Sequence, residues 1–297
     1  MNNICLFLML KINYTRVKIL PFKIPKPENE ALVYQEDYDL LFYDKLHQHE
    51  EIQISLIAKG EGTLVVGDSV TDYKDDDILI MGSNLPHVFK SDITEGKSSL
   101  MMSLFFNKNS FGNHFFELKE FDSLDSFFKQ SVYGLKLISN KNELKKLFLR
   151  LKKASKLERF ILLFEILQLI SKSRTASLSS FVNHKNYSDN EGKRMTAIFA
   201  YTMSHFDHPI SLTQIAGVAN MTTNAFCKYF KQRTNKTYVE FLTELRIAYA
   251  CKLLHKNNDL SVGEIATSSG FNTISNFNRK FKLLKKRTPG VFKKNLP

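Results

Sequence analysis

The chain has 297 residues and is 43% hydrophobic, which is enough to bury a substantial core and to form two domains. Its net charge is +12, and the segment from Arg194 to Pro297 carries 16 Lys and Arg against 5 Asp and Glu, whereas residues 1–193 carry 26 against 25. Three scattered cysteines without a C-x-x-C pair, and no apolar run near the roughly 20 residues of a membrane span, argue against a disulfide framework, a thiolate metal site and a membrane protein.

These features predict a protein of a reducing cytoplasm. The uneven charge predicts a polyanionic partner for the last third of the chain only. At the other end, residues 4–10 read ICLFLML, a run too short and wrongly flanked for an export signal. We treat residues 1–30 as a lead, in which this run is an extra strand, a disordered segment or a misplaced start.

Residues 31–120 have the pattern of an antiparallel β-sandwich or small barrel. Short β-branched runs at 52–58, 63–66 and 78–81 are separated by Gly, Asp and Asn at intervals of about ten residues. Helices are expected over 121–170, where apolar residues recur every three or four positions between 142 and 170 and predict two amphipathic helices. Either both helices only cover the sheet, or the second also packs against its copy in a dimer.

A segment rich in Ser, Asn and Lys, residues 171–193, is expected to be a linker. The basic part after it, 194–297, contains an internal repeat. Ile215-Ala216 recurs as Ile265-Ala266 after fifty residues, and four further positions recur after fifty-one, namely Phe226, Phe230, Thr237 and Phe241 as Phe277, Phe281, Thr288 and Phe292.

Each copy has the form of a helix-turn-helix, at about 211–232 and 261–284. Ser211 and Ser261 stand where N-caps are expected, the second with Glu264 at the capping-box position. Asn220 and Gly270 stand where a tight turn requires positive φ. The second helix of each unit buries an aromatic stripe and leaves its polar face free.

The spacing on that polar face is typical of a helix that enters the major groove of DNA. The residues that we expect to read bases are Asn224, Cys227 and Lys228 in the first unit and Ile274, Ser275, Asn278 and Arg279 in the second. Those expected to contact phosphates are Thr223, Lys231, Lys236, Thr273, Lys282, Lys285, Lys286 and Arg287. Two such units in tandem, in the only strongly basic part of the chain, predict a double-stranded DNA partner.

From about His205 to Asn295 the chain resembles the AraC/XylS family of bacterial transcription regulators. The resemblance rests on SLTQIAGVANMTTNAFCKYFKQRTNKTYVEFL, LRIAYACKLL and IATSSGFNTISNFNRKFKLLKKRTPGVFK. It implies two helix-turn-helix units, joined by a long helix, that enter successive major grooves. Where the family usually has Gly after each recognition helix, this chain has Asn235 and Lys286, of which Lys tolerates a left-handed conformation poorly.

The N-terminal part resembles, less specifically, the cupin-type sensor domain that is common in the family. The stretches HQHEEIQISLIAKGEG and DDDILIMGSNLPHVF carry the resemblance, and His47, His49 and His87 fall on positions that hold a metal in cupin enzymes. The expected carboxylate position is Gln53, a weak donor, and Asp76 replaces a usual Gly. We therefore assign these three histidines and Gln53 to an effector site without a metal or other cofactor, while a metal at the histidines stays open.

The expected fold class is α+β with two domains: a cupin-like β-sandwich or barrel followed by helices, and an all-α, homeodomain-like tandem helix-turn-helix domain. The expected function is a sequence-specific regulator, not an enzyme, that responds to a small-molecule effector and activates transcription. The resemblance implies a homodimer in the bacterial cytoplasm, at the nucleoid when bound, with RNA polymerase as a further candidate partner. One alternative is a metal-dependent cupin enzyme with an accessory DNA-binding domain. Another is a regulator whose N-terminal domain has lost its ligand and only dimerises.

Overall fold

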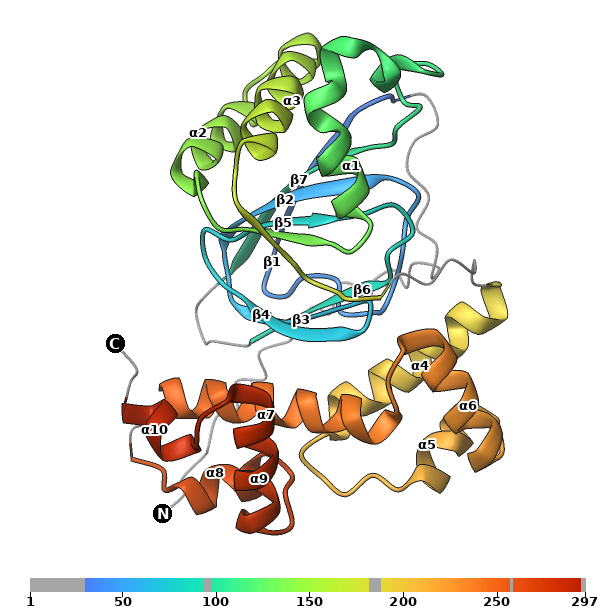
Figure 1. The fold of residues 1–297 in the computed structure, drawn as a ribbon, viewed down its shortest axis with the longest axis vertical. Helices are drawn as coiled ribbons and strands as arrows, with labels where there is room; N and C mark the ends of the chain where they lie inside the picture. Colours follow the sequence, from blue (N-terminus) through green and yellow to red (C-terminus); the bar gives the residue numbers. More distant parts are fainter. Residues whose placement is uncertain (1–29, 93–97, 182–187, 257–258, 295–297) are drawn as a thin grey trace, which may run out of the picture.

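The computed structural model describes residues 30–92, 98–181, 188–256 and 259–294 (Figure 1). The lead segment 1–29, with its ICLFLML run, lies outside the described residues. The described chain forms a β-rich N-terminal domain and a helical C-terminal region, so the predicted two-domain α+β class is confirmed.

Two antiparallel sheets form the N-terminal domain. The larger has the strand order β1-β7-β2-β5-β8-β9 and the smaller the order β4-β3-β6. The strands of the larger sheet are β1 (Val33–Asp39), β2 (Ile52–Lys59), β5 (Ile78–Met81), β7 (Ser99–Phe106), β8 (Leu135–Leu137) and β9 (Thr175–Ser177). Those of the smaller sheet are β3 (Gly62–Val66), β4 (Ser69–Tyr73) and β6 (His87–Ser91).

Alternation along the strands separates two cores. On β2, Ile52, Ile54 and Leu56 face the helices, whereas Ile57 packs against the smaller sheet in a core with Leu64 and other residues. The helices that cover the outer face of the larger sheet are η1 (Phe115–Glu117), η2 (Lys119–Leu124), α1 (Asp125–Ser131), α2 (Lys141–Leu151) and α3 (Lys156–Ser171) (Figure 1). The domain therefore has three layers: helices, the six-stranded sheet and the three-stranded sheet.

A buried ion pair joins α2 to the sheets. Asp77, which is 1% exposed, accepts hydrogen bonds from Lys136 at 2.6 Å and Lys141 at 2.8 Å. Burial alone would raise the pKa of Asp77, but the two ammonium groups hold the pKa below its usual value.

The segment 171–193, expected to be a linker, is structured in part. It includes β9, which pairs with β8, and the first residues of α4 (Asp189–His205). Asp68 accepts hydrogen bonds from the hydroxyls of Ser179 at 2.7 Å and Ser180 at 2.6 Å, which fixes the chain against the turn between β3 and β4. Patterns of Ser and Asn do not distinguish a free linker from one whose hydroxyls bind a buried carboxylate.

The C-terminal region consists of helices. After α4 come α5 (Leu212–Val218), α6 (Thr223–Thr234), α7 (Tyr238–Lys256), α8 (Val262–Ser268), α9 (Ile274–Lys285) and α10 (Pro289–Lys294). The pairs α5–α6 and α8–α9 are the two helix-turn-helix units, and α7 joins them. Each unit has its own aromatic core, around Phe226 and Phe230 in the first and around Phe277 and Phe281 in the second.

The local signals predicted for the two turns are confirmed. Ser211 and Ser261 form capping boxes with Gln214 and Glu264, and Asn220 and Gly270 have φ of 52° and 80°. A Cβ on Gly270 would lie 2.6 Å from the carbonyl oxygen of Phe206, so this turn needs glycine for close approach as well as for its φ.

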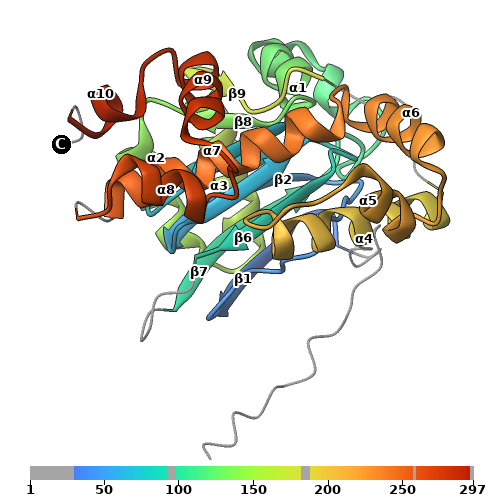
Figure 2. The ribbon, with the colours of Figure 1, turned by 90° about the horizontal axis from the view of Figure 1, so that it is seen from below.

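The C-terminal helices pack against the N-terminal domain, with α7 lying along the smaller sheet in both views (Figures 1 and 2). Within the described residues, no helix is long and apolar enough to cross a membrane.

Candidate DNA interface and effector site

The exposed face of α6 carries the side chains predicted to read bases in the first unit. Thr222 caps the helix by accepting a hydrogen bond from the Ala225 N–H at 3.4 Å. Asn224 and Lys228 are exposed, one turn apart, on the side opposite the buried Phe226 and Phe230. Cys227 is half-buried against the core of the unit, so it lies at the edge of this face rather than at its centre.

The second unit repeats this arrangement on α9. Thr273 caps the helix, and Ile274, Ser275, Asn278 and Arg279 are all exposed. Arg279 donates a hydrogen bond to the Asn276 side chain at 3.0 Å, which holds the guanidinium on the exposed face. The structure thus brings the expected residues of each unit onto one accessible helix face, and their contacts with bases remain a prediction.

The residues predicted to bind phosphate differ in their availability. Lys231, Lys282 and Lys286 are exposed, whereas both carboxylate oxygens of Glu244 lie 2.7 Å from the ammonium of Lys236. Thr223 is half-buried, and Thr273 uses its hydroxyl as the N-cap of α9. The guanidinium of Arg287 lies over the ring of Phe292, 5.4 Å from its centre.

Lys285 is half-buried and lies near the buried Cys251, which sequence spacing did not indicate. Burial raises the pKa of the Cys251 thiol to about 11, against the opposing effect of the nearby Lys285 ammonium, and the charge of Lys285 also acts on Asp72 of the sensor domain. We therefore take Lys282 as the better phosphate probe on α9.

The second candidate site is a cluster of buried histidines between the two sheets of the sensor domain. His47, His49 and His87 are 8%, 3% and 0% exposed, and one ring nitrogen of each lies within 4.8 Å of those of the others. His47 and His87 also form an antiparallel backbone bridge.

Backbone carbonyls orient each of the three rings. The Nδ1 atoms of His47, His49 and His87 lie 2.9, 2.8 and 2.8 Å from the carbonyl oxygens of Lys45, Glu51 and Leu85. A carbonyl only accepts, so each Nδ1 carries the proton, and in a neutral ring Nε2 is then an acceptor.

Gln53 extends this cluster into a buried polar network. Its Oε1 lies 3.0 Å from the Nε2 of His49, and its Nε2 donates to the Ser55 hydroxyl at 2.7 Å. An amide oxygen only accepts, so the contact with His49 is a hydrogen bond when that ring carries a proton on Nε2 as well as on Nδ1. The hydroxyls of Ser55 and Ser103 lie 2.8 Å apart. Buried polar groups between two sheets are suited to orient a small polar ligand.

Comparisons with known proteins match the two parts of the chain that contain these candidate sites. Residues 215–295 match the family model of a helix-turn-helix domain, and residues 31–104 match that of the AraC-like ligand binding domain. The chain belongs to the AraC-type transcriptional regulators. It is accordingly a DNA-binding regulator of transcription with an AraC-like ligand-binding domain.

The relatives of this AraC-type regulator include whole-length and partial matches. The HTH-type transcriptional regulator YdeC of Bacillus subtilis is 26% identical over 85% of this chain and 87% of its own length. The MmsAB operon regulatory protein of Pseudomonas aeruginosa is 24% identical over 34% of this chain and 33% of its own length. Among solved structures, an apo ToxT variant of Vibrio cholerae is 15% identical, covers 92% of this chain and 100% of that chain, and has a TM-score of 0.36.

The histidine cluster of the regulator fits a metal ion only in part. Three neutral imidazoles with oriented rings are a common donor set for Zn²⁺, Ni²⁺ or Cu²⁺. However, Gln53 supplies a neutral amide where a carboxylate would offset charge, so a divalent ion would leave its charge buried and uncompensated. A ligand that hydrogen-bonds the ring nitrogens meets no such cost.

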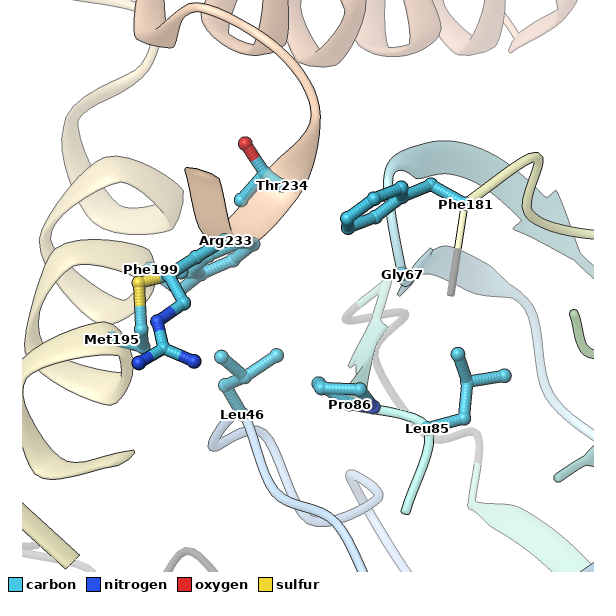
Figure 3. Close-up of a pocket in the computed structure, with 9 residues that line it drawn as sticks. All are labelled: Leu46, Gly67, Leu85, Pro86, Phe181, Met195, Phe199, Arg233 and Thr234. Atoms are coloured by element: carbon cyan, nitrogen blue, oxygen red, sulfur yellow. The ribbon is translucent and has the colours of Figure 1, made fainter. Parts of the chain in front are cut away.

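The contacts between sensor and DNA-binding helices involve residues that sequence analysis did not single out. Leu46, beside His47, packs with Met195 and Phe199 of α4, and the Leu46 carbonyl accepts a hydrogen bond from Thr196 at 3.1 Å. Figure 3 shows Leu46, Leu85 and Pro86 of the N-terminal domain facing Met195, Phe199 and Arg233 of α4 and α6 across a small pocket between the two domains. The available signals in the sequence were two apolar residues that each stand next to a histidine of the cluster, Leu46 beside His47 and Val88 beside His87.

Proposed function

We propose that this regulator recognises its operator through α6 and α9 in successive major grooves and activates transcription when a small-molecule effector binds at His47, His49, Gln53 and His87. It acts in the cytoplasm as a homodimer on double-stranded DNA, in contact with RNA polymerase, and catalyses no reaction. The observation that carries the proposal is the pair of capped helices with exposed polar faces, joined by the single helix α7.

Three features support the parts of this proposal that concern DNA. The C-terminal region holds almost all of the excess positive charge. Both reading helices bury aromatic side chains and expose polar ones, and each begins at a threonine N-cap. The guanidinium of Arg279 can form a bidentate contact with O6 and N7 of guanine, whereas the flexible ammonium of Lys282 is suited to a phosphate.

The test of base recognition compares Arg279→Ala with Lys282→Ala in the full chain. After genome-wide mapping of bound DNA has given the operator, binding is measured on operator and scrambled duplexes at several salt concentrations. Arg279→Ala should weaken operator binding by about 1 to 3 kcal/mol and scrambled binding much less. Lys282→Ala should weaken both alike and reduce the salt slope by about one contact. Equal losses on both duplexes for Arg279→Ala would show that α9 does not read bases.

The proposed homodimer rests on apolar side chains that the sheet does not cover. On α3, Leu162, Leu163 and Ile166 are buried against the larger sheet, whereas Leu157 and Ile161 are 70% and 51% exposed. Together with Leu149 of α2, 54% exposed, Ile161 lines a groove between the two helices. Arg150, Lys153 and Glu158 line the same groove, and uncovered apolar side chains rimmed by charged ones are typical of a protein interface.

The alternative of a metal-dependent enzyme has little support from the site. The histidine cluster is buried, and the polar side chains that follow it in the hydrogen-bonded network are Gln53, Ser55 and Ser103, an amide and two hydroxyls rather than the acid and base of a catalytic set. Metal analysis of the purified protein separates the two proposals, since an enzyme of this class would carry about one ion per chain.

A further inference from the structure

The three-stranded sheet of the sensor has two faces with different roles. Register places Val65 opposite Val70 on one side and Val88 on the other, and Thr63 opposite Asp72. Residues opposite one another share a face and successive residues alternate, so these five side chains lie on the outer face. His87, beside Val88, lies on the inner face with the histidine cluster.

One end of this outer face is an apolar contact with the DNA-binding region. Val65 and Val88 are buried, at 1% and 2% exposure, in the same core as Met195 and Phe199 of α4. The pocket between the two domains beside this contact has a volume of about 10 Å³, which is room for about one water molecule. The sensor and the first helix-turn-helix unit are therefore closely packed here (Figure 3).

The other end is polar and holds the helix that joins the two units. The Lys252 ammonium of α7 donates to the Thr63 hydroxyl at 2.7 Å and to Asp92 at 2.9 Å, and lies 3.7 Å from Asp72. Lys252 is 14% exposed, so the sensor and not water supplies most of its partners. The Asp72 side chain is 45% exposed, so this carboxylate lies at the rim of the contact. Its partial burial raises the pKa of Asp72 despite the attraction of Lys252 and Lys285.

We propose that the outer face of this sheet is an intramolecular docking surface, on which Asp72 and Asp92 take the place of DNA phosphates and so lower the affinity of the docked protein for DNA. Carboxylates and phosphates are both anionic oxygen ligands of lysine, and the two acids act on cations of α7 and of the end of α9. Their negative charge reduces the positive potential that attracts any duplex.

The docking surface also connects the proposed effector site to the DNA-binding helices. His47 follows Leu46, and His87 precedes Val88, so each histidine is one residue from a side chain that packs on α4. An occupant that moves either histidine moves these contacts. This connection to the effector rests on the proposed effector site, whereas the proposed lowering of DNA affinity by Asp72 and Asp92 does not.

The test uses the full chain and a random-sequence duplex of about 30 base pairs, long enough for three helical turns, so that it needs neither the operator nor the effector. The variant Asp72→Asn/Asp92→Asn should bind this duplex about fivefold more tightly than the wild type, since two repelling charges beside the bound region are removed. Affinity is measured by fluorescence anisotropy, and thermal unfolding followed by circular dichroism verifies that each variant is folded.

The matched control is Glu120→Gln/Asp122→Asn, which removes the same charge from exposed positions on η2. It should change affinity less than twofold at about 0.15 M salt, where distant charges are screened. The swapped pair Lys252→Glu/Asp92→Lys keeps the net charge and the ion pair, and should stay closer to the wild type than Asp92→Lys alone.

If Glu120→Gln/Asp122→Asn raised the affinity for the duplex as much as Asp72→Asn/Asp92→Asn does, the docking proposal would be overturned. The gain in affinity would then result from the change in net charge alone. Unchanged or weaker binding by Asp72→Asn/Asp92→Asn would overturn it as well. Failure of both the wild type and Asp72→Asn/Asp92→Asn to bind any duplex would instead refute the proposed DNA-binding role of α6 and α9, so the two failures are distinguishable.

Discussion

At the scale of single residues, the same side-chain type serves different purposes according to what it faces. Lys236 is paired with Glu244, Lys252 is held by sensor carboxylates, and Lys282 is exposed, although sequence spacing gives no reason to separate them. A charge run predicts a polyanionic partner, but only packing decides which of its members can reach that partner.

The histidine cluster gives a prediction at this scale. A His47→Ala, His49→Ala, His87→Ala variant should remain folded, lose effector-dependent activation and retain DNA binding, because the rings lie in the sensor core and not on α6 or α9. Promoter activity in cells, measured across inducing conditions, checks this. The exposed His114→Ala is the matched control and should respond normally. If the folded triple variant regulated its promoter normally, the effector would not bind at these histidines.

At the scale of elements, the ends of the reading helices show how local signals and tertiary context combine. Both helices end at a residue in the left-handed conformation, Asn235 with φ of 56° and Lys286 with φ of 58°. The family resemblance predicted a special conformation at these two positions, and the structure keeps it without glycine. Lysine has no side-chain hydrogen bond that favours this region, so the surrounding fold must impose it.

Replacing Lys286 by Gly should therefore stabilise the protein. Relief of the left-handed strain gains about 1 to 2 kcal/mol, and the extra freedom of glycine in the unfolded chain costs about 0.5 to 1 kcal/mol, so a net gain of about 0.5 to 1 kcal/mol is expected. Urea unfolding of the full chain measures it. Asn235→Gly should change stability by only a few tenths of a kcal/mol, since Asn tolerates this conformation. Destabilisation by Lys286→Gly would mean that the lysine side chain makes contacts worth more than the strain.

The helices α2 and α3 give a second prediction at this scale. Leu157→Glu/Ile161→Glu places two charges in the proposed interface without disturbing a buried side chain, and should convert a dimer into a monomer. Sedimentation velocity measures the change. Leu118→Glu, at a position that is also exposed, at 51%, should leave the dimer intact. A double variant that stays dimeric would place the interface elsewhere.

At the scale of the whole molecule, local sequence patterns predicted most of the helices and strands but not how the two domains pack together. Alternating and helical periodicity predicted the β-rich sensor, the two helices over its sheet and the tandem units, because these depend on residues near one another in the chain. The docking of Lys252 on Asp92 joins residues 160 positions apart, and the charge of Lys285 acts on Asp72, which is also distant in the chain. Long-range contacts of this kind leave no periodic trace in the sequence.

The spacing of the two units can be tested on the molecule as a whole. Residues 188–297, bound to the operator, should protect two major-groove segments about one helical turn, roughly 10 base pairs, apart on one side of the duplex, because α7 joins α6 and α9 within one domain. The fragment begins at residue 188 rather than 194 because Glu191 pairs with Arg233 and belongs to the capping box of α4. Hydroxyl-radical and methylation footprints give the spacing, with Arg279→Ala in the same fragment as control. That variant should lose protection at one segment and keep the other. Protection of a single segment by the unmodified fragment would contradict recognition by both units.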